Sequence, residues 1–348
     1  MIEQHNSKPK RRIELDIAKG IGIILVVWAH TNAPASKYIN QFHMPFFFFI
    51  SGMRYLNKGR SIKEYTIRKC KSLLIPFWSW NLIFYPIFFI LYNWKKWSLG
   101  VAVKQTLEII FTVNKVPFLG ATWFLPALFW VSVIVHILLK IFGNMKFADA
   151  YLFILSIIIC VIGLQITFPY KISRMLICSL YYVSGYLFQK YIRDFISNRL
   201  KSFLSVGSFA LFVIIASYNT VSLSANEYKF KIAFVIGAYL ASFFVLWISE
   251  LVEKYFKNSI FSNHIIYLGQ NSIDILIWQF LAFRIAIIIQ IVFLKVPMKS
   301  LVSFPVYDSS GLWWIVYLLA GIYCSLVWKY ILEHNVLSKY MKKYYIIR

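Results

Sequence analysis

The sequence predicts an all-α polytopic membrane protein with about ten transmembrane helices and both termini in the cytoplasm. Of its 348 residues, 60% are hydrophobic and 19% are aromatic, and the mean hydropathy is +0.66. These values are well above those of soluble domains of this length. Apolar runs of helix length recur along the whole chain, and Lys and Arg are concentrated in the connections between them.

Each predicted span is a run of about 20 mainly apolar residues, the length that crosses the hydrocarbon core of a bilayer. The segment 101–113 is too short and too charged to cross, so we expect an interfacial helix or a surface loop there. The first run is interrupted by Asp16 and Lys19 and many runs follow it, so we interpret it as a retained helix and not a signal peptide. The ten predicted spans are 14–31, 39–56, 72–93, 121–142, 149–166, 174–191, 202–218, 231–252, 267–294 and 311–332.

The distribution of basic residues predicts the orientation. Connections on the amino-terminal side of the membrane hold about twice as many Lys and Arg as those on the opposite side, and cytoplasmic loops carry this excess. The net charge of +24 therefore reflects topology, and we expect no nucleic acid partner. We divide the chain into a basic cytoplasmic tail (1–13), a ten-helix membrane domain (14–332) and a second basic tail (333–348), located in the inner (cytoplasmic) membrane and in contact with membrane lipids.

Two histidines are the candidate catalytic residues. His30 lies at the outer end of the first predicted span and His43 near the outer end of the second, so the short connection can bring both to one cavity. A neutral imidazole there can accept a proton from a hydroxyl group. The alternative is that each histidine only forms a hydrogen bond at the level of the lipid headgroups. We expect no metal, because two clustered histidines lack a carboxylate at ligand spacing and the four cysteines are scattered.

Cationic residues near the opposite surface are candidates for binding an anionic ligand. Lys19 precedes His30 by eleven residues, so both lie on one helix face, about 16 Å apart along the axis. Arg68 and Lys71 reach the same side of the membrane at the start of the third span, and together the three cations suit a phosphate group. The alternative is that they only set the topology. Asp16 is three residues from Lys19, so we assign it a structural, orienting role through a local ion pair.

Two further polar or aromatic residues are candidates for substrate binding. Gln279 lies within the ninth predicted span, where it can bond a ligand or only a neighbouring helix. Trp123 can line a sugar site, since apolar sugar faces stack on aromatic rings, or it belongs to the interfacial aromatic belt. For Asp274 and Arg284 in the ninth span, contacts between helices or with the interface are the preferred interpretation.

At these residues the chain resembles the membrane-bound acyltransferase 3 family, especially its fucose 4-O-acetylase-like and polysaccharide O-acetyltransferase members. The resemblance extends over nearly the whole chain in length and number of spans. Matching motifs are the basic residue and histidine separated by ten residues (Lys19 and His30), the LD..KG lead-in (Leu15, Asp16, Lys19 and Gly20), the HMPxFFxxSG segment (His43 to Gly52) and W-F-L (Trp123 to Leu125).

Two motifs of the family are met only in part. The R-x-x-R motif is present as Arg68 and Lys71, which keeps the charge and loses the second planar guanidinium. In NSIDILIWQF, Gln279 stands where the family often has histidine, which leaves a hydrogen-bonding role but not proton transfer.

The resemblance implies a membrane O-acetyltransferase of the cell envelope. Acetyl-CoA, a co-substrate, enters from the cytoplasm, and the acetyl group passes to a sugar hydroxyl on a lipid-linked or exported glycan. His30 serves as the base or the acetyl carrier, and Lys19, Arg68 and Lys71 contact the donor. The sequence leaves open whether the protein forms a homo-oligomer.

Two other functions compete with this hypothesis. One is a secondary transporter or glycan exporter in which Asp16, Lys19, His30 and Asp274 form a proton relay. The other is a non-catalytic membrane partner of a polysaccharide polymerase. Binding or hydrolysis of acetyl-CoA separates the first alternative from an acyltransferase, and a His30→Ala variant separates the second.

Overall fold

The computed structural model describes residues 12–56, 59–93, 98–113, 116–193, 195–223 and 225–347, and these residues are almost entirely helical. The first half of the chain contains α1 (Ile13–Ala29), α2 (Ser36–Ile39), α3 (His43–Met53), α4 (Ile62–Lys69), η1 (Cys70–Leu74), α5 (Ile75–Asn93), α6 (Leu99–Ile110), η3 (Pro117–Trp123), α7 (Phe124–Phe142), α8 (Ala148–Gln165), η4 (Pro169–Lys171) and α9 (Ile172–Leu187). The second half contains η5 (Phe188–Ile192), α10 (Asn198–Tyr218), β1 (Val221–Ser222), β2 (Glu227–Tyr228), α11 (Lys231–Tyr255), α12 (Ile260–Gln270), α13 (Ser272–Leu294), η6 (Met298–Val302), α14 (Trp313–Leu319), η7 (Ala320–Cys324), α15 (Ser325–His334) and α16 (Ser338–Lys343).

The predicted all-helical membrane class is confirmed, whereas the number of spans stays a prediction. Seven helices among the described residues are long and apolar enough to cross a membrane, and they correspond to seven of the ten predicted spans. The other three predicted spans fall on α1, α3 and α9, with 17, 11 and 16 residues. The cytoplasmic placement of the termini also stays a prediction, and most of the predicted tail 1–13 lies outside the described residues.

Three predicted spans have different bounds in the structure. The helix predicted at 72–93 begins ten residues earlier, at Ile62, and runs through α4 and η1 into α5. The span predicted at 39–56 is helical only from His43 to Met53, and a helix of this length extends about 16 Å, too short to cross a bilayer alone. Ten of its eleven residues are buried by neighbouring helices. The span predicted at 267–294 starts at Ser272, because Asn271 leaves the helical conformation and separates α12 from α13.

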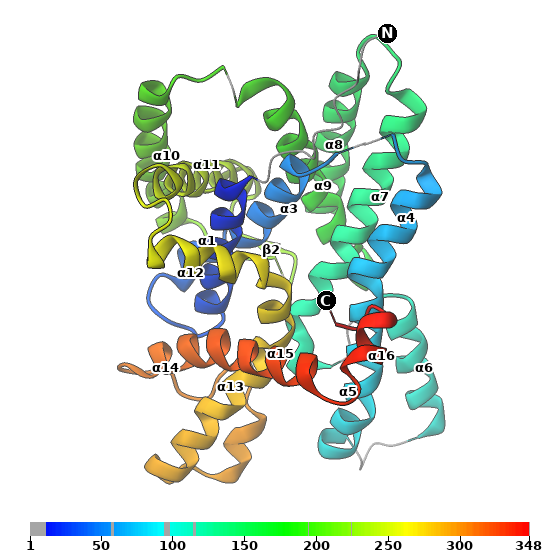
Figure 1. Ribbon diagram of the computed structural model, residues 1–348, viewed down its shortest axis with the longest axis vertical. Coiled ribbons are helices and arrows are strands. Elements are labelled where there is room, and N and C mark those ends of the chain that lie inside the picture. The colour runs from blue at the N-terminus through cyan, green and yellow to red at the C-terminus, as the bar shows by residue number, and fades with distance from the viewer. Residues whose placement is uncertain are drawn as a thin grey trace.

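The helices divide into two groups that meet at α3 and α9. Figure 1 shows α4 to α8 in the right half of the molecule and α1 with α10 to α13 in the left half, while α3 and α9 lie side by side near the middle. The core is rich in aromatic side chains, and Phe46, Phe48, Phe77, Tyr181 and Phe283 are fully buried.

Two helix crossings depend on pairs of glycines. Gly20 of α1 faces the backbone of α12, and Gly269 of α12 faces the backbone of α1; Gly52 and Gly185 have the same reciprocal relation between α3 and α9. A methyl group at any of the four positions would collide with backbone atoms of the partner helix. Small residues allow this close approach, which is typical of helix pairs in membranes.

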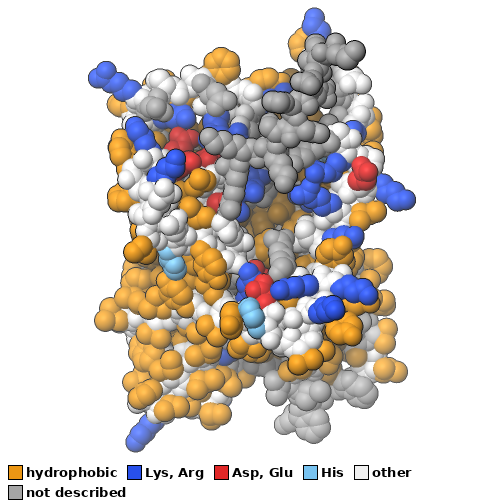
Figure 2. Space-filling model, in the orientation of Figure 1, with side chains coloured by type: hydrophobic (Ala, Val, Ile, Leu, Met, Phe, Trp, Pro, Cys, Tyr) orange, Lys and Arg blue, Asp and Glu red, His pale blue; other side chains and the backbone are white. Residues whose placement is uncertain are grey.

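Much of the surface is apolar, as expected for a protein in contact with lipid. Figure 2 shows hydrophobic side chains over most of the lower part of one face, while Lys and Arg gather mainly higher up and beside a hollow near the middle. Helices α8 and α10 expose many large apolar residues, among them Ile154, Ile158, Phe203 and Ile214. Lipid chains can cover such surfaces without a cost in hydrophobic free energy.

Candidate active site

The connection between α1 and α3 brings the two candidate histidines together. His30 caps the carboxyl end of α1 and His43 begins α3, and the chain between them folds back through the short helix α2. The two imidazole rings lie 6.1 Å apart between centroids, at an angle of 80°. The connection is anchored by Gln41, whose Nε2 donates to the carbonyls of Ala216 (3.0 Å) and Asn219 (3.3 Å).

Both rings make the same backbone contact, which fixes their tautomers. Nδ1 of His30 lies 2.7 Å from the carbonyl oxygen of Val26, and Nδ1 of His43 lies 2.9 Å from that of Ile39. Because a carbonyl oxygen only accepts, we assign the proton of each neutral ring to Nδ1. Nε2 then carries a lone pair, and no hydrogen bond from a described residue reaches Nε2 of either ring. The Nε2 atom of each histidine can therefore act as a base or a nucleophile.

The surroundings of His30 are formed by aromatic rings from distant segments. Phe280 of α13 packs edge-on against His30, with 4.9 Å between ring centroids. Phe304, in the connection after η6, lies 4.8 Å from Phe280, and Gly120 of η3 faces both phenylalanines. His43 is buried, with 6% of its surface exposed, whereas His30 is only half-buried.

Arg284 holds the segment that carries Phe304 in place. Its guanidinium donates to the carbonyls of Leu301 (2.8 Å), Ser303 and Pro305, and its Nε donates to the carbonyl of Phe280 (3.2 Å). The planar fork of arginine suits such multiple donation. Arg284 thus has the structural role expected from the sequence, and it acts on a segment that packs beside His30.

An ion cluster lies at the opposite end of α1. Oδ1 of the buried Asp16 is 2.9 Å from Nζ of Lys19 and 2.9 Å from Nη1 of Arg54, at the carboxyl end of α3. Lys19 and His30 are separated by about 16 Å along the helix. A single carboxylate therefore orients two cations and joins α1 to α3 at the end remote from the histidines.

Arg68 and Lys71 line a cavity of about 550 Å³ together with Tyr345 from the carboxyl-terminal segment. Nζ of Lys71 lies 3.1 Å from the Tyr345 hydroxyl and 4.5 Å from the centre of its ring. Lys19 is not among the described residues that line this cavity. The structure thus brings two of the three candidate donor-binding cations together and leaves Lys19 in the Asp16 cluster.

The candidate substrate-binding residues lie in other surroundings. Trp123, at the end of η3, is half-buried, and the guanidinium of Arg174 lies 5.0 Å from the centre of its ring. Nε2 of Gln279 donates to the carbonyl of Leu276 (3.2 Å), while its Oε1 is buried without a partner among the described residues. The side chain that packs against His30 belongs to the next residue, Phe280.

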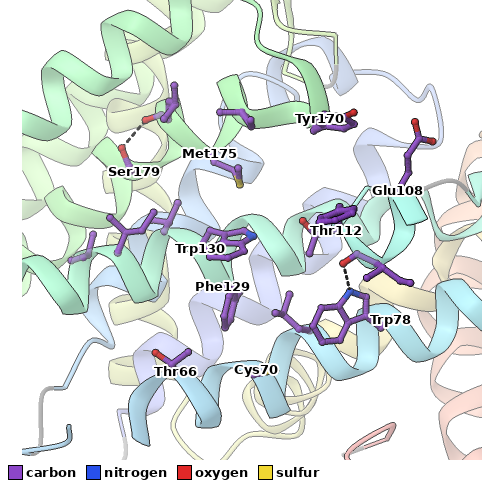
Figure 3. A pocket seen from close by; sticks show the side chains of 18 of the residues that line it. Thr66, Cys70, Trp78, Glu108, Thr112, Phe129, Trp130, Tyr170, Met175 and Ser179 are labelled. Carbon is purple, nitrogen blue, oxygen red and sulfur yellow. Dashed lines mark hydrogen bonds between the residues drawn. The ribbon is translucent and has the colours of Figure 1, made fainter. Parts of the chain in front are cut away.

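A further cavity, of about 1530 Å³, contains none of the candidate residues. Figure 3 shows its lining, in which Trp78 bonds a backbone carbonyl while Phe129, Trp130 and Met175 present apolar surface. It lies between α4, α5, α6, α7, α8 and α9, and its chemistry suits lipid chains. No group of three or more His, Cys, Asp or Glu side chains that could hold a metal ion occurs in the part of the chain that the structure describes.

Sequence reasoning missed three residues that the structure places at these sites. Phe280 is one of 32 phenylalanines, and nothing in the sequence distinguishes it. Arg54 and Arg174 stand at the ends of apolar runs, where a basic residue is expected as a topology signal. Only the tertiary contacts show that Arg54 shares the Asp16 carboxylate and that Arg174 is buried beside Trp123.

Comparison with known proteins gives one match. The model of a family described as an acyltransferase domain matches residues 12–334, which include both histidines, the Asp16 cluster and the cavity residues Arg68 and Lys71. No curated protein matches the chain. No solved structure matches it either.

Proposed function

Because the chain belongs to the acyltransferase 3 family and is a multi-pass membrane protein, we propose that it transfers an acetyl group from cytoplasmic acetyl-CoA to a sugar hydroxyl of a surface or lipid-linked polysaccharide. The observation that carries this proposal is the pair of imidazoles in one place, each with its proton held on Nδ1 and its Nε2 open. A proton acceptor of this kind is what transfer to a hydroxyl requires.

In the proposed reaction, Nε2 of His30 takes the proton of the acceptor hydroxyl while the hydroxyl oxygen bonds to the thioester carbonyl carbon. The carbon–sulfur bond breaks, the CoA sulfur leaves with the electron pair, and it receives the proton from the His30 imidazolium. The products are an acetyl ester and the CoA thiol. The open Nε2 also permits a route through an acetyl-imidazole on His30, which the hydroxyl then attacks.

The donor is proposed to enter at the cationic cavity. Arg68 and Lys71 would bind its phosphates, and Tyr345 offers an aromatic face to its adenine. In this proposal the donor enters from the side of the membrane where these cations are expected. Acetyl transfer then takes place near His30, at the carboxyl end of α1.

The transporter alternative draws on the same ionisable residues. A relay through Asp16 and Asp274 would require carboxylates that exchange protons, but Asp16 lies between Lys19 and Arg54, and Asp274 is 3.7 Å from Nζ of Lys329. Fixed ion pairs of this kind favour ionised, structural carboxylates. The contacts of the described residues therefore do not favour a proton relay or, with it, the transporter alternative.

The test measures O-acetyl groups on the surface polysaccharide of the host by NMR. Strains would express wild type, His30→Ala, His334→Ala or no protein, with membrane levels matched. His334 is the control because its Nδ1 makes the same contact with a carbonyl four residues earlier (2.9 Å) on an exposed part of α15. We expect acetyl signals to disappear in the null and His30→Ala strains and to persist in His334→Ala. Equal acetylation in all strains would refute the proposal.

A further inference from the structure

Arg174 is a buried cation for which the described residues provide no hydrogen bond and no ion pair. It lies in the first turn of α9 and only 6% of its surface is exposed. Its guanidinium carbon lies 5.0 Å from the centre of the Trp123 ring, in a cation–π contact. Nη1 is fully buried without a partner, although a guanidinium has five N–H groups to satisfy.

The comparison with Arg284 shows that the protein can satisfy a buried arginine when its role is structural. Arg284 is as buried as Arg174 (6% exposed), yet its guanidinium reaches four backbone carbonyls. The ionisable groups that interact electrostatically with Arg174 are Tyr228 and Cys178, and both are ordinarily neutral at pH 7. A buried cation without compensation is costly, so the missing partner is expected to be an anion from outside the chain.

The position of Arg174 relates this anion to the proposed active site. Trp123 is the last residue of η3, and Gly120 in the same turn packs against Phe280, the neighbour of His30. The residue after Trp123, Phe124, packs against two phenylalanines of α3, the helix that begins at His43. The η3 segment therefore packs against Phe280, which contacts His30, and also carries the Arg174 contact.

A polar cavity that includes Tyr228 has the chemistry of a sugar site. It measures about 510 Å³ and lies at the β1–β2 hairpin. Its lining includes the hydroxyls of Thr167, Thr220 and Ser222, the Asn226 amide, Tyr228 and the charged residues Glu227, Lys229 and Lys231. Tyr228 also interacts electrostatically with Arg174. Hydroxyl and amide groups can donate and accept hydrogen bonds, as recognition of a polyhydroxylated ligand requires.

We propose that Arg174, held over Trp123, binds an anionic group of the acceptor glycan: the carboxylate of an acidic sugar or the phosphate of a lipid-linked sugar. Both present paired oxygens that a guanidinium can bind with two parallel hydrogen bonds. The identification of the anion as part of the acceptor rests on the proposed function, whereas the anion site itself rests only on the surroundings of Arg174.

The test uses the full chain in phosphatidylcholine nanodiscs and measures equilibrium binding of three probes. They are a tetrasaccharide of alternating glucuronate and N-acetylglucosamine, undecaprenyl phosphate, and the neutral N-acetylglucosamine tetramer. The variants are Arg174→Gln, Arg174→Lys and Lys299→Gln. Lys299 is the matched control because it is an exposed cation of η6 that does not line this cavity, and thermal unfolding checks that each variant is folded.

We expect one anionic probe to bind wild type at least about tenfold more tightly than the neutral tetramer, with Arg174→Gln removing this preference and Arg174→Lys retaining part of it. Preference for the acidic tetrasaccharide identifies a carboxylate, and preference for undecaprenyl phosphate identifies a phosphate. Lys299→Gln should bind as wild type does. The inference is overturned if neither anionic probe shows the preference or if Arg174→Gln retains it. Binding without His30-dependent acetylation would refute the proposed function and leave the anion site standing.

Discussion

Replacing Arg284 with glutamine is expected to release the segment that carries Phe304 and to disturb His30 from a distance. The side chain makes three hydrogen bonds to carbonyls of this segment, at Leu301, Ser303 and Pro305. Hydrogen bonds to a charged group contribute about 1.5–3 kcal/mol each. The released carbonyls regain bonds to water, so we expect a net loss of about 2–4 kcal/mol in the free energy of unfolding.

The assay combines thermal unfolding of the purified protein in nanodiscs with O-acetylation of the host glycan. A loss of this size corresponds to a fall in melting temperature of about 3–5 °C for a chain of this length. Acetylation should fall as well, because Phe304 supports Phe280 and Phe280 packs against His30. Arg284→Lys should recover only part of the stability, since an ammonium group cannot reproduce the planar fork.

The control for this prediction is Arg174→Gln, which removes a cation of equal burial that makes no hydrogen bond to a described residue. Its melting temperature should be unchanged or higher than that of wild type, because an uncompensated buried charge is lost. If Arg284→Gln and Arg174→Gln have the same melting temperature, the structural assignment of Arg284 is wrong. An Arg284→Gln variant with the stability and acetylation of wild type would also contradict this assignment.

Three other variants test the packing, the ion cluster and the donor cavity. Gly185→Leu should abolish the monodisperse folded protein in size-exclusion chromatography, because a Cβ there meets the backbone of Phe49, whereas Gly207→Leu, whose Cβ meets nothing, should not. Asp16→Asn should lower the free energy of unfolding by about 1–3 kcal/mol, since two cations lose their shared carboxylate; an unchanged thermal midpoint would contradict this. Lys71→Gln should raise the KM for acetyl-CoA about tenfold and leave kcat nearly unchanged, and initial rates that do not depend on this substitution would exclude Lys71 from the donor site.

The fold could be predicted from the sequence wherever a helix faces lipid or an evenly apolar core. The predicted spans 121–142, 149–166 and 202–218 agree closely with α7, α8 and α10, because hydropathy alone determines such segments. Prediction failed at α3, where the apolar run is longer than the helix. A run that is buried by protein on all sides need not have the length of a span, and hydropathy does not distinguish the two cases.

The candidate site was predictable where it depends on position along a helix and not where it depends on contacts between helices. The two histidines end one run and begin the next, so their proximity follows from the short connection. The separation of Lys19 from the cavity of Arg68 and Lys71 does not follow from the sequence, since a charge near a membrane surface can turn toward several helices. The same is true of Arg174, whose lack of a described partner becomes visible only when its neighbours are known.

The two histidines are not equivalent, and their difference suggests how the proposed reaction is divided between them. Both hold their proton on Nδ1, but His43 is buried while His30 is half-buried and lies at the end of a helix. A glycan hydroxyl can reach only an accessible ring, which makes His30 the base for the acceptor. The centres of the two rings are 6.1 Å apart, so a group bound between them can contact His43 while His30 holds the hydroxyl. We assign His43 to the thioester or the leaving thiol because it is the less accessible ring, so His43→Gln should slow transfer while leaving acceptor binding intact.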